Sequence, residues 1–302
     1  MIPTIHQYSI VVVLLLFNFN SLAQDTELFK IQSTYYPSQA VEASSIDGAI
    51  GFWEWSGHLA IPQVFKSKGM LLIHKLGYRN LRVVMEGNFT NAVAEVNKHY
   101  HSVFYNLTWV KILNPKWRLL VNVMPTLASD FTESLSDRDF LFQASAMAIL
   151  AKSEKIKYGF GLAYTTRFGR QIIMPTAMLN YTRPKMTVDV LLPSKLSILF
   201  NTHKHFHFGL EATLDGGLFN NNGEVPIVNT LIDEAGYSRL NLGPTLVFQL
   251  KDAIRIHLTG GMAVGRRLDL IDGTEEVLDR TPEDGPFFRV GFSFRPQGKR
   301  GE

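Results

Sequence analysis

The stretch Phe287-Phe288-Arg289-Val290-Gly291-Phe292-Ser293-Phe294 alternates strictly between apolar side chains and polar or small ones. Successive side chains of an extended strand point to opposite faces, so a period of two predicts one aromatic face and one polar face. A strand of this kind near the C-terminus is typical of outer-membrane β-barrels, whose apolar face meets lipid and whose other face meets the lumen. The stretch predicts an architecture and a compartment, but it leaves the function open.

The N-terminal residues indicate export. Residues 10–17 form a compact apolar run, and Ser21-Leu22-Ala23 has the small-x-small pattern that signal peptidase cuts. The run is shorter than the roughly 20 residues that a membrane-spanning helix needs. We therefore expect a cleaved signal peptide over residues 1–23. An uncleaved anchor is the alternative, because the residues before the run include no Lys or Arg.

Composition excludes several classes of protein. The chain has no cysteine, which excludes a disulfide scaffold, a thiolate zinc site and a cysteine nucleophile. The net charge of +3 is too small to indicate a nucleic-acid partner. No second apolar run reaches the length of a membrane-spanning helix, so a membrane-spanning form of this chain would have to cross as strands.

Segments with a period of two recur along the whole chain, and aromatic residues gather at their ends, as in the interface girdles of membrane barrels. We predict an all-β, antiparallel up-and-down barrel of about fourteen transmembrane strands. The predicted strands are 27–36, 50–62, 69–80, 100–113, 116–130, 139–151, 156–168, 171–181, 185–192, 195–201, 205–216, 238–250, 253–267 and 286–295.

The predicted connections alternate in length. Those after even-numbered strands are short, whereas several after odd-numbered strands are long: 81–99, 131–138, 217–237 and 268–285. Short periplasmic turns and long external loops give this asymmetry, with both termini in the periplasm. A barrel of twelve strands is the alternative if Pro193 only bulges a strand. A soluble β-sandwich would show the same alternation of faces but has no reason to show this asymmetry.

Three features give the chain a resemblance to known proteins. They are Leu22-Ala23-Gln24, the step Leu191-Leu192-Pro193-Ser194-Lys195 and the closing Phe288–Phe294 segment. On these the chain resembles a Bacteroidota outer-membrane β-barrel family of unknown function over most of residues 24–295. The resemblance implies an outer-membrane location and brings no catalytic residue. We expect one barrel domain over residues 24–302, with a polar tail at 296–302.

Charged residues gather on the predicted lumen face, and basic ones outnumber acidic ones. Charges that line a pore bias permeation toward ions of opposite sign, which here favours anions. The alternative is that the charges pair across a filled lumen and hold the barrel closed. The candidate lumen-facing residues are Arg118, Lys157, Arg167, Glu211, Arg239, Arg255, His257 and Arg289.

Three other groups of residues are candidates for chemical sites. His203, His205 and His207 with Glu211 have a strand spacing that does not converge on a metal. The acidic stretch 268–285 lacks the spacing of a calcium loop. His99, His101, Ser129, Asp130, Ser134 and Asp137 form no compact catalytic motif. We therefore expect no metal, no cofactor and no enzymatic activity.

The sequence predicts a non-enzymatic outer-membrane barrel of a Gram-negative bacterium that passes small solutes. The alternatives are a structural or surface-binding barrel with a filled lumen and, after that, an outer-membrane hydrolase. The expected partners are outer-membrane lipid and lipopolysaccharide, the barrel-assembly machinery and small solutes, with no nucleic acid.

Overall fold

The computed structural model describes residues 27–41, 48–88, 93–222, 232–250, 253–272 and 275–296. The signal peptide predicted over residues 1–23 and residues 297–302 of the polar tail lie outside these ranges. Among the described residues, no helix is long and apolar enough to cross a membrane. The strands are β1 (Phe29–Ala40), β2 (Gly48–Phe65), β3 (Met70–Asn88), β4 (Val93–Ile112), β5 (Trp117–Ser129), β6 (Phe140–Ala151), β7 (Ile156–Thr165), β8 (Ile172–Arg183), β9 (Met186–Leu192), β10 (Lys195–His203), β11 (Phe206–Asn220), β12 (Glu234–Leu250), β13 (Ile254–Asp272), β14 (Glu275–Arg280) and β15 (Gly285–Phe294).

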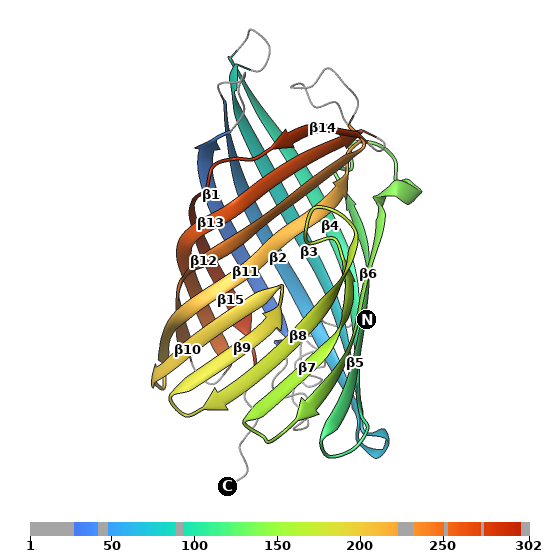
Figure 1. Ribbon diagram of the computed structural model, residues 1–302, viewed down its shortest axis with the longest axis vertical. Helices are drawn as coiled ribbons and strands as arrows, with labels where there is room; N and C mark the ends of the chain where they lie inside the picture. The colour runs from blue at the N-terminus through green and yellow to red at the C-terminus, as the bar shows by residue number, and fades with distance from the viewer. Residues whose placement is uncertain are drawn as a thin grey trace, which may run out of the picture.

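Fourteen of these strands form a closed antiparallel barrel (Figure 1). Each strand pairs with its neighbour in sequence from β1 to β13, and β15 lies between β1 and β13. The short β14 pairs only with the far end of β13 and stands outside the ring. The predicted architecture of fourteen strands is confirmed, and the sandwich alternative is wrong. The twelve-strand alternative is also wrong, because Pro193 and Ser194 separate β9 from β10 as two paired strands.

The described connections are short at one end of the barrel and include the long ones at the other, as predicted. The short-turn end is at the bottom of Figure 1 and the long-connection end is at the top. Three of these connections are shorter in the structure than predicted, however. Most of 81–99 belongs to β3 and β4, the segment 217–237 contributes to β11 and β12, and 268–285 contains the end of β13 and all of β14.

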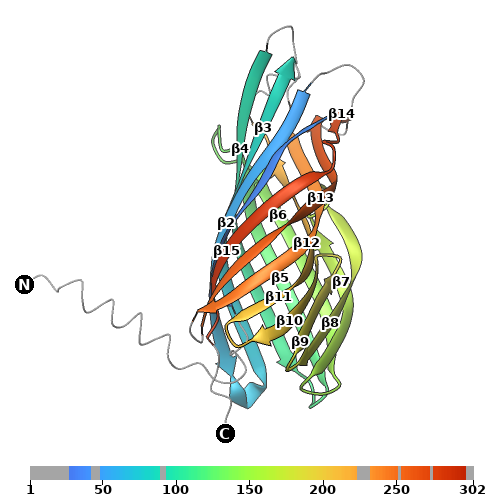
Figure 2. The ribbon, with the colours of Figure 1, turned by 90° about the vertical axis from the view of Figure 1, so that its left-hand side faces the viewer.

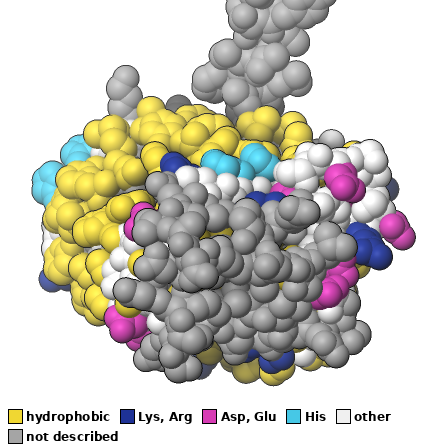
Figure 3. Space-filling view, turned by 90° about the horizontal axis from the view of Figure 1, so that it is seen from above, with side chains coloured by type: hydrophobic (Ala, Val, Ile, Leu, Met, Phe, Trp, Pro, Cys, Tyr) yellow, Lys and Arg dark blue, Asp and Glu magenta, His cyan; other side chains and the backbone are white. Residues whose placement is uncertain are grey.

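The outward face of the barrel carries a belt of exposed apolar side chains. On β15, Phe288 is 61% exposed whereas Phe287 is 1% exposed, so the predicted alternation places the aromatic face outside. Exposed aromatic and aliphatic side chains recur on the other strands, and Figure 3 shows hydrophobic side chains along part of the outer wall. An apolar exterior around a polar interior is the distribution that a bilayer requires.

Toward the long-connection end, the apolar side chains lie on the inward face of the strands and polar ones lie on the outward face. Leu81, Val83 and Met85 of β3 point inward and are buried, while Arg82 points outward. Leu268 and Leu270 of β13 are buried in the same interior cluster. We call this apolar interior the upper core. Its residues are Tyr36, Ile50, Phe52, Leu81, Val83, Met85, Tyr100, Ala128, Leu141, Leu218, Phe219, Ile232, Ala235, Tyr237, Ala263, Leu268, Leu270 and Phe287.

This exchange of faces explains the connections that were predicted too long. The strands continue beyond the apolar belt with the same period of two, but with the apolar residues inside, as in the sheet of a soluble protein.

The wall of the barrel is uneven in height. Strands β7 to β10 are short, whereas β2 to β4 and β11 to β13 are long and extend well beyond them (Figures 1 and 2). Above the short strands, β11 meets β5 through a parallel bridge between Asn220 and Ser129. The lumen is therefore enclosed by fewer strands at the long-connection end than at the short-turn end.

Candidate functional site: a charged and aromatic layer in the lumen

Arg289 of β15 reaches across the lumen to β11. Its guanidinium forms an ion pair with Asp215, lies 3.3 Å from Glu211 and donates a hydrogen bond to Thr213 at 3.1 Å. Its Nε donates to Thr34 of β1 at 3.1 Å. The side chain is 8% exposed. A charge buried to this degree needs paired carboxylates and hydrogen-bond acceptors, and Arg289 has both.

Arg239 of β12 lies deeper in the interior and forms an ion pair with Glu54 of β2. The Arg239 side chain is 1% exposed. Arg79 of β3 approaches the second oxygen of Glu54 at 3.9 Å and donates to the carbonyl oxygen of Gly216 at 3.0 Å. The interior of the barrel is thus crossed by contacts between β2, β3, β11 and β12.

Aromatic rings enclose the Arg239 guanidinium. Its central carbon lies 3.7 Å from the ring centre of Tyr36, 4.7 Å from that of Phe52 and 4.8 Å from that of Tyr237. Tyr36 also stacks on Phe287 with ring centres 6.1 Å apart. Cation–π contacts of this kind gain strength when water is excluded.

Asn241 joins the two arginine groups. Its amide donates to the Tyr36 hydroxyl at 3.0 Å and to Asp215 at 2.7 Å. We call the connected set the lumen layer. It consists of Tyr36, Phe52, Glu54, Arg79, Glu211, Asp215, Tyr237, Arg239, Asn241, Phe287 and Arg289. Its members come from β1, β2, β3, β11, β12 and β15, and most are buried. The layer adjoins the upper core and shares Tyr36, Phe52, Tyr237 and Phe287 with it.

The predicted lumen-facing residues fall into four places. Arg239, Arg289 and Glu211 belong to the lumen layer. Arg255 and His257 lie on the inward face of β13 toward the short-turn end, where Arg255 donates to Gln249 at 2.6 Å and His257 contacts Ser293 at 3.1 Å.

Arg118 and Lys157 lie apart from the lumen layer, whereas Arg167 lies at its edge, near enough to interact electrostatically with Asp215, Arg79 and Tyr237. Arg118 and Lys157 share the inward face of β5 and β7 beside the short turns, near a pocket of about 390 Å³. Arg167 lies beyond the end of β7 and donates to the carbonyl oxygen of Leu214 at 3.4 Å. It therefore binds the edge of β11 that no neighbouring strand covers.

Sequence reasoning missed several members of the lumen layer, including Glu54 and Tyr36. A signal for Glu54 was present, because a carboxylate between Trp53 and Trp55 occupies the inward position of an outward aromatic pair. Tyr36 carried no signal of this kind, because its neighbour Tyr35 faces outward and the two rings look alike in sequence.

The candidate catalytic residues lie near the bridge between β5 and β11. His101 pairs with Ser129 in the register of β4 and β5. Ser129 is fully buried, its hydroxyl accepts a hydrogen bond from Asn222 at 3.2 Å, and it also hydrogen-bonds to Asp139. Asp130 pairs with Lys98 at 2.7 Å. A buried serine whose oxygen is engaged in this way is poorly placed as a nucleophile.

Asp139 fixes the connection between β5 and β6 to the end of β11. It caps the short helix over Asp137–Asp139 by accepting from the Ser136 backbone at 2.7 Å, and it accepts from Asn220 at 2.7 Å. Burial by itself raises the pKa of Asp139, but hydrogen bonds from Asn220, Ser136 and Ser129 outweigh it and lower that pKa below its ordinary value.

No metal centre was found in the part of the chain that the structure describes. There, no group of three His, Asp or Glu side chains is arranged to hold an ion. His203 and His205 lie side by side with ring centres 5.8 Å apart at the turn between β10 and β11, while His207 has entered the strand.

A family profile described as Domain of unknown function (DUF6268) matches residues 87–295, well over half of the chain. No curated protein matches the sequence.

Among solved structures, the transport unit of the autotransporter AIDA-I from Escherichia coli is similar, with 11% identity, 96% of this chain and 97% of that chain covered, and a TM-score of 0.38. The NanC porin is 9% identical, with 88% and 98% covered and a TM-score of 0.36. The translocator domain of NalP from Neisseria meningitidis is 11% identical, with 96% and 94% covered and a TM-score of 0.35.

Proposed function

The chain belongs to the family described as Domain of unknown function (DUF6268), and we propose that it is a non-enzymatic outer-membrane β-barrel whose lumen is closed by the lumen layer. The observation that carries this proposal is the pair of buried arginines, Arg239 and Arg289, each held by carboxylates from a different strand. An ion pair that joins distant strands through the barrel interior occupies the space that a solute would need.

The proposed role is that of a structural barrel that presents its long connections at the cell surface. We place the short turns and both chain termini in the periplasm, after export through a cleaved signal peptide. The asymmetry of the connections and the apolar belt support this orientation. The upper core then projects beyond the bilayer as a rigid support for the surface connections.

The orientation is testable because the natural chain contains no cysteine. A single Ser134→Cys variant, at an exposed position between β5 and β6, should react with a membrane-impermeant maleimide on intact cells. A matched Ser153→Cys variant, in the turn between β6 and β7, should react only after the outer membrane is broken. Labelling of Ser153→Cys alone on intact cells would reverse the proposed orientation.

The closure is testable by solute entry into proteoliposomes. Wild-type protein should not admit small sugars or anions, and a Tyr36→Ala/Phe287→Ala variant should admit them because it removes two stacked rings from the layer. Retention of the folded band in unheated gels checks that the variant still forms a barrel. Rapid entry through the wild-type protein would contradict the closure.

Passage of small anions is the second candidate function, and one observation favours it. Toward the short-turn end, the inward face carries Lys30, Lys75, Arg118 and Lys157, and none of the four makes an ion pair within the described residues. Unpaired positive charge attracts anions into a lumen. Under this alternative the lumen layer is a gate, and wild-type proteoliposomes would admit anions faster than neutral solutes of equal size.

A further inference from the structure

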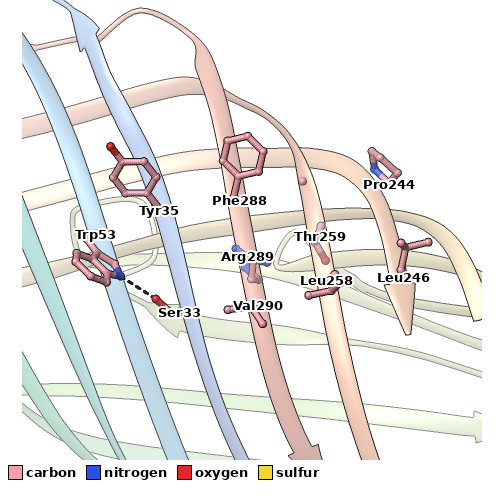
Figure 4. Close-up of a pocket in the computed structure, with 11 residues that line it drawn as sticks. Ser33, Tyr35, Trp53, Pro244, Leu246, Leu258, Thr259, Phe288, Arg289 and Val290 are labelled. Atoms are coloured by element: carbon pink, nitrogen blue, oxygen red, sulfur yellow. Dashed lines mark hydrogen bonds between the residues drawn. The ribbon is translucent and has the colours of Figure 1, made fainter. Parts of the chain in front are cut away.

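An apolar groove of about 850 Å³ lies on the outer wall of the barrel, across β2, β1, β15, β13 and β12 (Figure 4). Most of its lining side chains point away from the lumen, and several are highly exposed. The outward-facing residues that line it are Ser33, Tyr35, Trp53, Pro244, Leu246, Leu258, Gly260, Phe288 and Val290.

The groove exists because two neighbouring rows of outward positions contain small residues among large ones. In one row Trp53, Tyr35 and Phe288 are cross-strand neighbours and are followed by Gly260. In the other row Ser33 lies between Trp55 and Val290. The missing side chain at Gly260 and the short one of Ser33 leave space beside the aromatic rings.

Two of the polar groups that line this groove bind each other. The indole Nε1 of Trp53 donates to the Ser33 hydroxyl at 2.8 Å (Figure 4). This bond satisfies the indole N–H within the groove and holds the Trp53 ring along the side of the groove. A polar ligand would find few unengaged partners here, whereas a hydrocarbon chain needs none.

The height of the groove indicates which leaflet it faces. On β1, β2 and β15, the last exposed large apolar side chains toward the long-connection end are Tyr35, Trp53 and Phe288. Aromatic residues that end an apolar belt mark the interface between bilayer and water. The groove therefore begins at the interface on the side of the long connections and continues into the apolar belt.

We propose that this groove holds one acyl chain of lipopolysaccharide. The inference rests on the proposed orientation, because lipopolysaccharide occupies the outer leaflet and the groove opens on the leaflet of the long connections. Its continuity with the lipid-facing belt argues for a membrane lipid over a protein partner. Arg82, the outward cross-strand neighbour of Trp53, places a positive charge above the groove, on the side where lipid headgroups lie.

The proposal is tested by a substitution that fills the groove and leaves the barrel intact. A Cβ atom added at Gly260 would find its nearest neighbour at 3.6 Å, which is ordinary contact. A Gly260→Leu variant should fold and should occupy the space of the acyl chain. Ala146→Leu is the matched control, because Ala146 is an exposed outward position on β6, far from the groove.

The measurement is native mass spectrometry of the full-length protein, extracted from outer membranes in a mild detergent. Wild type and Ala146→Leu should retain one lipopolysaccharide molecule. Gly260→Leu should retain about tenfold less, the effect of losing about two buried methylene groups from the contact. If Gly260→Leu fails to assemble, Val290→Phe fills the other row of the groove and should give the same loss.

Three results would overturn the proposal: no lipid retained by wild type, equal retention by Gly260→Leu, or a phospholipid in place of lipopolysaccharide. Failure of the closed-lumen proposal is recognised separately, because solute entry through the barrel does not depend on what covers its outer wall.

Discussion

At the scale of single residues, Arg239 carries a buried charge in the barrel interior. Its guanidinium lies between one carboxylate and three aromatic rings and is shielded from water. Removing one partner of a buried ion pair leaves the other charge without compensation, and this costs more than the pair contributes when it is intact.

An Arg239→Met variant should therefore lose about 3–5 kcal/mol of unfolding free energy, because Glu54 stays buried without its partner. Arg79 at 3.9 Å offers Glu54 only a weak substitute. The measurement is urea unfolding of the refolded barrel in lipid vesicles, followed by tryptophan fluorescence.

The control is the double variant Arg239→Met/Glu54→Gln, which should recover most of the loss because no buried charge remains. If the single variant unfolds at the same urea concentration as wild type, the ion pair does not support the interior as described.

Asp139 predicts a pH dependence at the long-connection end. Its pKa in the folded protein is lower than its ordinary value of 3.8, so its contribution to stability is complete above pH 3.8 and is lost as the pH falls through the folded-state pKa. Pepsin should cut the connection between β5 and β6 more readily as the pH falls into that range. An Asp139→Asn variant should lose this dependence, and an unchanged dependence would assign the effect to another carboxylate.

At the scale of strands, two adjacent glycines of β13 have opposite surroundings. A Cβ atom at Gly261 would lie 2.0 Å from the carbonyl oxygen of Leu242, whereas one at Gly260 would meet nothing closer than 3.6 Å. The backbone of β12 at Leu242 and Gly243 lies against the inward side of β13 at Gly261. Only the absence of a side chain permits that approach.

Gly261→Ala should therefore destabilise the barrel by about 1–3 kcal/mol, the usual cost of overpacking. Gly260→Ala should stay within about 0.5 kcal/mol of wild type. Thermal unfolding, followed by the shift from the fast-migrating to the slow-migrating gel band, compares the two. Equal effects of the two substitutions would show that the inward approach of β12 is not tight.

The strands also show how far sequence reasoning reaches. Their number, order and outward faces were predictable because the apolar belt imposes one simple rule: apolar side chains outside with a period of two. Their upper ends were not predictable in this way. At Leu81, Val83 and Met85 the apolar residues move to the inside, so the rule that identifies a membrane strand no longer applies.

Only some members of the lumen layer could be predicted from the sequence. Arg239 and Arg289 stand out as charged residues at inward positions of apolar strands. Their partners could not be assigned, because Glu54 and Asp215 lie far from them in sequence and meet them only across the closed barrel. Pairing across a lumen depends on strand tilt and register, which a single sequence does not specify.

At the scale of the whole molecule, the structure combines a membrane barrel with an interior like that of a soluble protein. The short-turn half has a polar interior and an apolar exterior, and the long-connection half contains the upper core. The lumen layer lies where these two parts meet. Under the proposed function, its position makes closure of the lumen a property of the folded barrel.

Single-channel recording in planar lipid bilayers tests this central claim most directly. With wild-type protein inserted, we predict no steady conductance steps at moderate voltages. The Tyr36→Ala/Phe287→Ala variant, inserted in equal amount, should give steps that favour anions because of the unpaired Lys and Arg side chains below the layer. Steady conductance through the wild-type barrel would contradict the account, because it would mean that the lumen layer does not close the lumen.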